Sequence, residues 1–138
     1  MAEQLPRERV LLYLRAVLES SAVGIIGHNL GFSGTVLAAE GVRVARVEQD
    51  LEVASFLMNA ERKSHDLEGM ALTWLRHKLP SLSAAIEESG GDAHSLSVEA
   101  AAEHMCARAQ VLWLLREQVD KDIDERELGA VYLSLIHI

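Results

Sequence analysis

Apolar residues near the start of the chain recur at spacings of three, four and seven. The repeat is carried by Val10, Leu11, Leu14, Val17 and Leu18. This period places all of them on one face of an α-helix. Pro6 suits the first turn, because proline lacks an N–H group and that group has no partner there. We therefore expect an amphipathic helix that ends near residues 20–21.

Two short apolar runs, 22–27 and 42–47, alternate with helical patterns. The first run is β-branched and too short for a helix, which predicts a parallel strand that is buried on both faces. A helix from Ser33 to a C-terminal glycine, Gly41, should connect it to the second strand. Strand and helix then alternate, and this order predicts an α/β arrangement.

The rest of the chain reads as helical. Asp50 is an expected N-cap for a helix over 51–59, and Ser97 is an expected N-cap for a long helix over 98–119. Further helices are expected over 64–75, after Pro80 and over 123–133, with a loop over 88–94. Apolar stripes predict which side chains are buried. We expect the core to include Val53, Phe56, Leu57, Trp74 and Trp113.

Composition and charge narrow the class of protein. The chain has 138 residues, 49% of them apolar, which suits one globular domain or part of one. It has no apolar run of roughly 18 residues and no signal-peptide block, so we expect a cytoplasmic location and no membrane partner. The net charge of −8 disfavours non-specific attraction to DNA phosphates. The single cysteine, Cys106, cannot form an internal disulfide and is expected to be buried.

The most informative motif follows the first predicted strand and reads Gly-His-Asn-Leu-Gly-Phe-Ser over residues 27–33. His28 and Asn29 stand at the carboxyl end of that strand, where open α/β sheets bind ligands. Asn29 could equally be a simple helix cap. Without further context, both interpretations remain open.

This segment resembles the second acidic motif, (Q/H)-N-x-x-(Y/F)-D, of the 3′–5′ exonuclease domain of family A DNA polymerases, the bacterial DNA polymerase I type. Three later segments resemble that domain in the same order. They contain Asp50, Ser55 and Leu57, then the run 65–78 with its His-Asp-Leu start, and finally 104–111 at the place of the third acidic motif. The four segments cover roughly residues 14–111.

The resemblance implies an incomplete ribonuclease H-like 3′–5′ exonuclease fold of the α/β class, with its first strands missing and a helix-rich C-terminal half. It implies a partial exonuclease-like domain over 1–132. It also implies that His28, Asn29 and Phe32 bind substrate, and that DNA and the rest of a polymerase chain are the partners. Members of the family use two divalent metal ions, Mg²⁺ or Mn²⁺, which carboxylates hold about 4 Å apart.

The departures from the family pattern concern the catalytic positions. Ser33 stands where the second motif has its aspartate, while His104 and Arg108 stand at the tyrosine and aspartate of the third. The first acidic motif would lie before Met1. Glu103 cannot substitute, because five helical residues place it about 140° around the helix from position 108. We therefore expect no intact catalytic set, no metal ligands and no cofactor in this chain. His104 is expected to be an ordinary, partly buried histidine.

The leading hypothesis is a degenerate exonuclease module that acts as a structural part of a DNA polymerase I. One alternative is an active, metal-dependent proofreading exonuclease on single-stranded DNA ends with relocated ligands. Another is an unrelated helical interaction module, in which His28 and Asn29 form only a cap. The apolar end, 133–138, resembles a translated sequencing adaptor and is expected to be a non-native tail.

Overall fold

The structure is a computed structural model that describes residues 5–137. Residues 1–4 and 138 belong to the two ranges expected above, the exonuclease-like domain and the tail, but they lie outside the described residues. Along the chain the elements are α1 (Arg7–Leu18), β1 (Ile25–Gly27), α2 (Leu30–Ala39), β2 (Val47–Asp50), α3 (Leu51–Met58), α4 (Leu67–Leu75), α5 (Leu82–Glu88), the 3-10 turn η1 (Ala93–Ser95), α6 (Val98–Glu125) and α7 (Gly129–Ile136).

The strands β1 and β2 pair in parallel, as the alternation of strand and helix predicts. Gly27 lies opposite Asp50 in this register, so both strands end at the same edge. The second strand was expected over 42–47, but it covers Val47–Asp50. The reason is the end of α2. There Gly41 has a φ of +74°, and the N–H of Val42 donates to the carbonyl of Leu37 at 2.9 Å, so Val42 is buried as part of a helix cap.

Helix caps explain most of the remaining boundaries. Asp50 and Ser97 cap α3 and α6 through their side chains, which confirms both predictions. Helix α2 begins at Leu30 and not near Ser33, because Asn29 caps it from a left-handed conformation with a φ of 58°. The cap interpretation of Asn29 is thus confirmed, and it does not exclude a role in binding.

The last two helices also differ from their expected bounds. Helix α6 continues past residue 119 to Glu125, because Val119 and Ile123 both remain on its buried face. It ends where Glu127 adopts a φ of 56° and the N–H of Leu128 donates to the carbonyl of Ile123 at 3.0 Å. Helix α7 therefore begins at Gly129 rather than at 123. The left-handed residue at the end of α6 is a glutamate. The sequence therefore lacks the glycine that usually marks the end of a helix.

The hydrophobic core lies where α3, α4 and α7 pack against α6. Its largest fully buried side chains include Leu51, Leu67, Met70, Leu115 and Val119. The burial of Val53, Leu57 and Trp74 is confirmed only in part, since they pack at the edge of this cluster.

Three expected core residues lie at the surface. Phe56 is 50% exposed, Trp113 is 61% exposed and Cys106 is exposed. Trp113 points outward because Val111 and Leu115, four residues apart, turn the opposite face of α6 inward.

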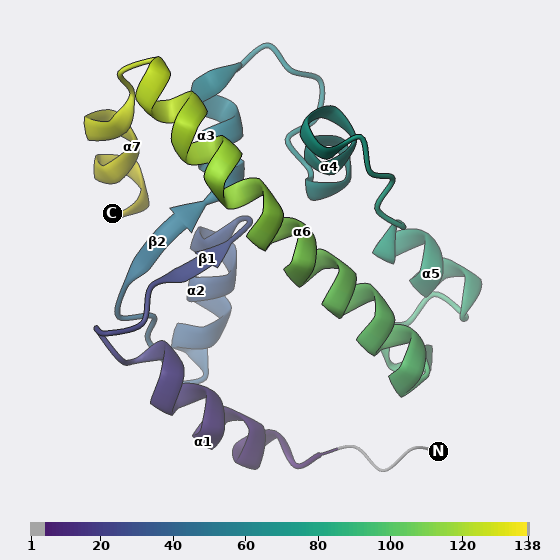
Figure 1. Cartoon of the computed structure of the whole chain (residues 1–138). Helices are drawn as coiled ribbons and strands as arrows, with labels where there is room; N and C mark the ends of the chain where they lie inside the picture. The colour runs from purple at the N-terminus through teal and green to yellow at the C-terminus, as the bar shows by residue number, and fades with distance from the viewer. Residues whose placement is uncertain (1–4, 138) are drawn as a thin grey trace.

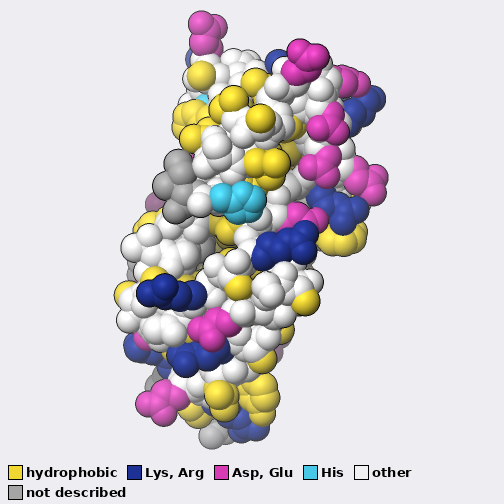
Figure 2. Space-filling view, turned by 90° about the vertical axis from the view of Figure 1, so that its left-hand side faces the viewer, with side chains coloured by type: hydrophobic (Ala, Val, Ile, Leu, Met, Phe, Trp, Pro, Cys, Tyr) yellow, Lys and Arg dark blue, Asp and Glu magenta, His cyan; other side chains and the backbone are white. Residues whose placement is uncertain are grey.

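Helix α6 crosses the molecule diagonally, with α4 and α5 toward one side and the strands and α2 toward the other (Figure 1). The carboxyl ends of β1 and β2 point toward this helix (Figure 1). Figure 2 shows the face of the molecule that carries α7. Hydrophobic side chains gather over the upper part of this face. A cavity of about 660 Å³ lies between α2, β2 and α7. Within residues 5–137, none of the helices has the length and apolar character needed to cross a membrane.

Candidate functional site

The carboxylate of Asp50 organises the edge where the two strands end. It accepts hydrogen bonds from the backbone N–H groups of Asn29, at 3.0 Å, and Leu30, at 2.7 Å. It also accepts from the N–H groups of Glu52, at 3.0 Å, and Val53, at 3.4 Å, in the first turn of α3. One buried side chain therefore caps two helices, because the parallel register brings both N-termini to the same edge.

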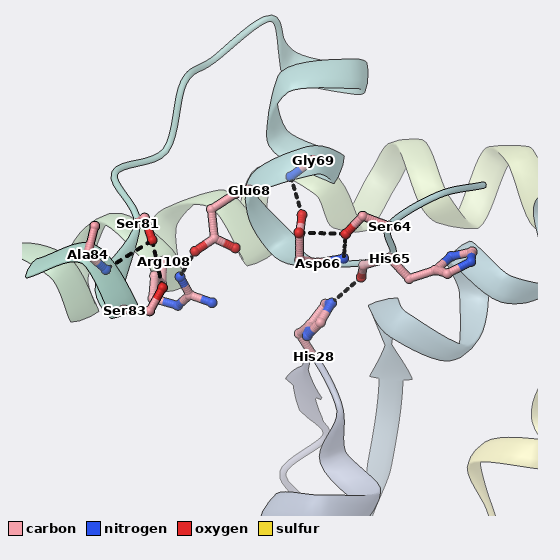
Figure 3. Close-up of polar contacts among 10 residues, drawn as sticks. All are labelled: His28, Ser64, His65, Asp66, Glu68, Gly69, Ser81, Ser83, Ala84 and Arg108. Carbon is pink, nitrogen blue, oxygen red and sulfur yellow. Dashed lines mark hydrogen bonds and ion pairs between the residues drawn. The ribbon is translucent and has the colours of Figure 1, made fainter. Parts of the chain in front are cut away.

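His28 connects this edge to the start of α4. Its Nε2 atom lies 2.6 Å from the carbonyl oxygen of His65, to which it donates a hydrogen bond. His65 is itself held in place: its Nδ1 atom lies 2.8 Å from the hydroxyl of Ser55, and its ring stacks on Phe56 at a centroid distance of 3.6 Å. Figure 3 shows the imidazole of His65 directed away from His28, so the contact between them uses the backbone alone.

Asp66 follows directly and caps α4. Its Oδ1 atom accepts from the N–H of Gly69 at 2.6 Å, and its Oδ2 atom accepts from the hydroxyl of Ser64 at 2.5 Å. These hydrogen bonds stabilise the carboxylate and lower the pKa of Asp66, the bond from Ser64 having the larger effect. Electrostatic interactions with His28 and Arg62 lower the pKa of Asp66 further, against an opposing effect of burial.

An ion pair joins α4 to α6 in the same region. Nη1 of Arg108 donates to Oε1 of Glu68 at 2.7 Å, and the two side chains are 24% and 30% exposed. Figure 3 shows this pair and His28 near the first turn of α4. The positive charge of Arg108 is therefore already matched by a carboxylate from a neighbouring helix.

The structure gathers only some of the residues that the sequence singled out. His28, Asn29 and Ser33 lie at the junction of β1 and α2, and the N–H of Ser33 donates to the carbonyl of Asn29 at 3.2 Å. His104 is half-buried on α6, as expected, one turn before Arg108. Phe32 is 68% exposed.

The resemblance implies a site for two divalent ions, and the residues at the expected ligand positions show whether such a site fits here. At one expected ligand position, Arg108 presents a cation that is already paired with Glu68. At another, Ser33 offers a neutral hydroxyl. Among the described residues, His, Cys, Asp and Glu form no group of three or more that could hold a metal ion. A cation and a neutral hydroxyl in place of two carboxylates do not fit a pair of dications.

Sequence reasoning missed two residues that shape this region. Glu68, the partner of Arg108, gave no signal, because the two lie 40 positions apart. Tyr132 lies 82 positions from Asp50, yet its hydroxyl accepts from the N–H of Asp50 at 2.9 Å and donates to its carbonyl at 3.1 Å. The available clue was a tyrosine in a short apolar helix, because the hydroxyl of a buried tyrosine usually has a hydrogen-bond partner.

Comparison with known proteins relates this chain to a DNA polymerase. It is 30% identical over 137 residues to a protein named DNA-directed DNA polymerase from Pseudomonas phage M6. The match covers 93% of this chain and 20% of that polymerase, so the chain spans about a fifth of the length of the relative it matches. No family model matches the chain. The sequence is therefore related to DNA polymerases.

Proposed function

We propose that this chain is a 3′–5′ exonuclease-like module of a family A DNA polymerase in which the metal-binding carboxylates have been replaced. In this proposal the module has an incomplete ribonuclease H-like fold and a structural role. Its partners are DNA and the remainder of the polymerase chain. The relationship to the phage polymerase and the order of the four resembling segments both support it.

The observation that carries the proposal is the ion pair between Arg108 and Glu68. Hydrolysis of a phosphodiester by two metal ions needs anionic ligands that hold both ions close together. Arg108 stands at the position of the third-motif aspartate and brings a positive charge there. Its guanidinium forms an ion pair with the nearby carboxylate of Glu68. A dication at this position would be repelled by the guanidinium and would compete with it for Glu68.

The same ion pair has a structural use in the proposed module. It joins the first turn of α4 to the middle of α6, close to the buried contacts of Met70, Ala71 and Val111. His28 adds a second connection, from the end of β1 to the backbone before α4. Where the family is expected to hold metal ions, these contacts tie the strands and helices together, and this supports a role in packing.

A digestion assay on a polymerase that contains this chain tests the proposal. The substrate is single-stranded DNA with a labelled 3′ end, in the presence of Mn²⁺. We expect no release of nucleotides from the 3′ end above that of a polymerase with its exonuclease domain deleted. Metal-dependent degradation that is lost in Ser33→Ala or His104→Ala would contradict the proposal and favour an exonuclease with relocated ligands.

The surrounding gene gives a second, independent test. Polymerase motifs in frame after Tyr132 are expected if the module belongs to a longer polymerase. A stop codon at that point would instead favour a separate helical interaction module.

A further inference from the structure

We infer that a second pocket, whose lining includes neither His28 nor Arg108, binds a phosphate group. It lies between the connector of α3 and α4 and the C-terminal part of α6. Both of these segments are in the upper part of Figure 1. Its volume is about 250 Å³. Its lining residues are Ser55, Met58, Asn59, Arg62, Thr73, Trp74, Asp122 and Arg126.

Two arginines from different elements line this pocket. Arg62 comes from the connector and Arg126 from the end of α6. Among residues 5–137, neither lies within 4.0 Å of a carboxylate, which is also true of Arg9, Arg43 and Arg76, whereas the other five arginines are paired. Two such arginines in one pocket stand out in a chain with a net charge of −8.

Protein contacts hold both guanidinium groups in place. Nη2 of Arg62 donates to the carbonyl of Gly69 at 2.9 Å and to the hydroxyl of Thr73 at 2.6 Å. Its guanidinium also lies over the ring of Trp74, 4.7 Å from the centroid. Nη1 of Arg126 donates to the carbonyl of Met58 at 3.2 Å. Each guanidinium carries five N–H donors, so further donors remain for an anion.

The size and charge of the pocket identify the class of ligand. A volume of about 250 Å³ is below the roughly 300–1,000 Å³ of sites that enclose a drug-sized ligand, so one small group fits better than a whole nucleotide. Guanidinium groups match phosphate oxygens in geometry and charge. Asp122 is the carboxylate in the lining, and its Oδ1 atom accepts from the side chain of Gln118 at 2.7 Å. The pocket keeps a net positive charge.

The ligand is therefore a phosphate group, carried either by a nucleic-acid backbone or by a free nucleotide. The pocket shares no residue with the region of His28, Ser33, His104 and Arg108. The inference goes beyond the proposed function, and its failure would leave that proposal unaffected.

A nuclear magnetic resonance titration of the whole 138-residue chain tests the inference. Inorganic phosphate is added at constant ionic strength, and the Nε–Hε signals of the arginines are followed. We expect saturable shifts for Arg62 and Arg126, and none for the exposed Arg43. Arg126→Gln should weaken binding about fivefold or more, whereas Arg43→Gln, with the same change in net charge, should not.

Asp122→Asn provides a test that does not depend on removing a structural arginine. Loss of the carboxylate should tighten phosphate binding about threefold or more, because it removes repulsion within the pocket. Asp124→Asn, an exposed change on the same helix, should have a smaller effect. Equal effects of the two substitutions would mean that net charge alone attracts the anion, and would overturn the inference.

Two more ligands separate the sources of the phosphate. One is a DNA oligonucleotide without terminal phosphates, which carries only phosphodiesters, and the other is a deoxynucleoside monophosphate. Saturable shifts with the oligonucleotide assign the pocket to a nucleic-acid backbone, and shifts with only the monophosphate assign it to a free nucleotide. Either result supports the inference. The absence of a saturable shift at Arg62 and Arg126 with all three ligands overturns it.

Discussion

The carboxylate of Asp50 accepts a hydrogen bond from the backbone N–H of Asn29 at 3.0 Å, across the parallel pair of strands. Asn29 has a left-handed backbone conformation, with a φ of 58°, which non-glycine residues adopt at a cost. The bond from Asp50 stabilises this conformation and thereby sets the direction in which α2 leaves the sheet. The orientation of the motif at 27–33 therefore depends on a residue about twenty positions later.

Asp50→Ala should lower the free energy of unfolding by about 1–4 kcal/mol, because it removes side-chain caps from both α2 and α3. Asp50→Asn should cost less, since one amide oxygen can still accept. Chemical denaturation measures both effects. Asp92→Ala is the matched control, because Asp92 caps only η1 through a single bond to the N–H of His94. Equal losses for Asp50→Ala and Asp92→Ala would contradict the double-cap interpretation.

Tyr132→Phe should destabilise the protein by about 1–3 kcal/mol, because the buried N–H of Asp50 would lose its acceptor. Tyr13→Phe, at a position that is 65% exposed, should have no measurable effect. If the Tyr132→Phe variant is as stable as the unmodified protein, this hydrogen bond makes no net contribution to the free energy of unfolding.

Alkaline unfolding gives a second measurement on Tyr132. Burial raises the pKa of Tyr132 above its ordinary value, so the folded state holds the proton more tightly than the unfolded state. This contribution to stability is complete below a pH of about 10 and is lost as the pH rises above it. Tyr132→Phe should reduce the loss of stability in that range, as followed by circular dichroism. An unchanged alkaline transition would contradict the prediction.

Leu115→Ala should cost about 2–5 kcal/mol, because Leu115 is fully buried where α6 faces the core. The adjacent Leu114 is 53% exposed and points away from it. Leu114→Ala should therefore change stability by less than about 0.5 kcal/mol. Thermal unfolding of the two variants measures this difference, and similar losses would show that the register of α6 is wrong.

A double-mutant cycle on Glu68 and Arg108, with alanine at each position, should give a coupling of about 1 kcal/mol. Both side chains are less than a third exposed, so salt should screen this pair only in part. The control is the exposed pair of Lys121 and Glu125, 3.7 Å apart, with an expected coupling below about 0.5 kcal/mol. A coupling near zero for Glu68 and Arg108 would remove the structural role assigned to this ion pair.

Asp66 should make stability depend on pH in the acidic range. Its pKa is lowered in the folded state, first by the hydrogen bond from Ser64, so the folded state favours the carboxylate. The resulting stability is present above the unfolded pKa of about 3.9, and it is lost as the pH falls through the lower folded value. Acid unfolding of Asp66→Asn should show a weaker dependence in this window. An identical acid transition would indicate that Asp66 titrates normally.

Local patterns in the sequence predicted several elements well. Periodicity predicted α1, and cap residues predicted the starts of α3 and α6 at Asp50 and Ser97. The glycine at the end of α2 was predicted correctly because a left-handed turn strongly favours that residue. These features depend on neighbours within about one helical turn.

Other features depended on distant contacts and were therefore predicted poorly. The buried face of α3 was expected to include Phe56, but α3 turns Leu51 and Ala54 toward α6 and leaves Phe56 to stack on His65. Both faces are apolar in the sequence, so only the position of α6 distinguishes them. The exposure of Trp113 has the same origin.

The sequence by itself determined the caps of α3 and α6, the parallel sense of the two strands, and the neutral and cationic side chains at Ser33 and Arg108. Only the tertiary structure decided which groups those residues meet: Glu68 for Arg108, the backbone of His65 for His28, and Asp50 for Asn29. Local propensity acts through a few neighbouring residues, whereas these contacts join positions 21 to 40 residues apart in the chain. Such contacts form only when packing of the core brings their helices and strands together.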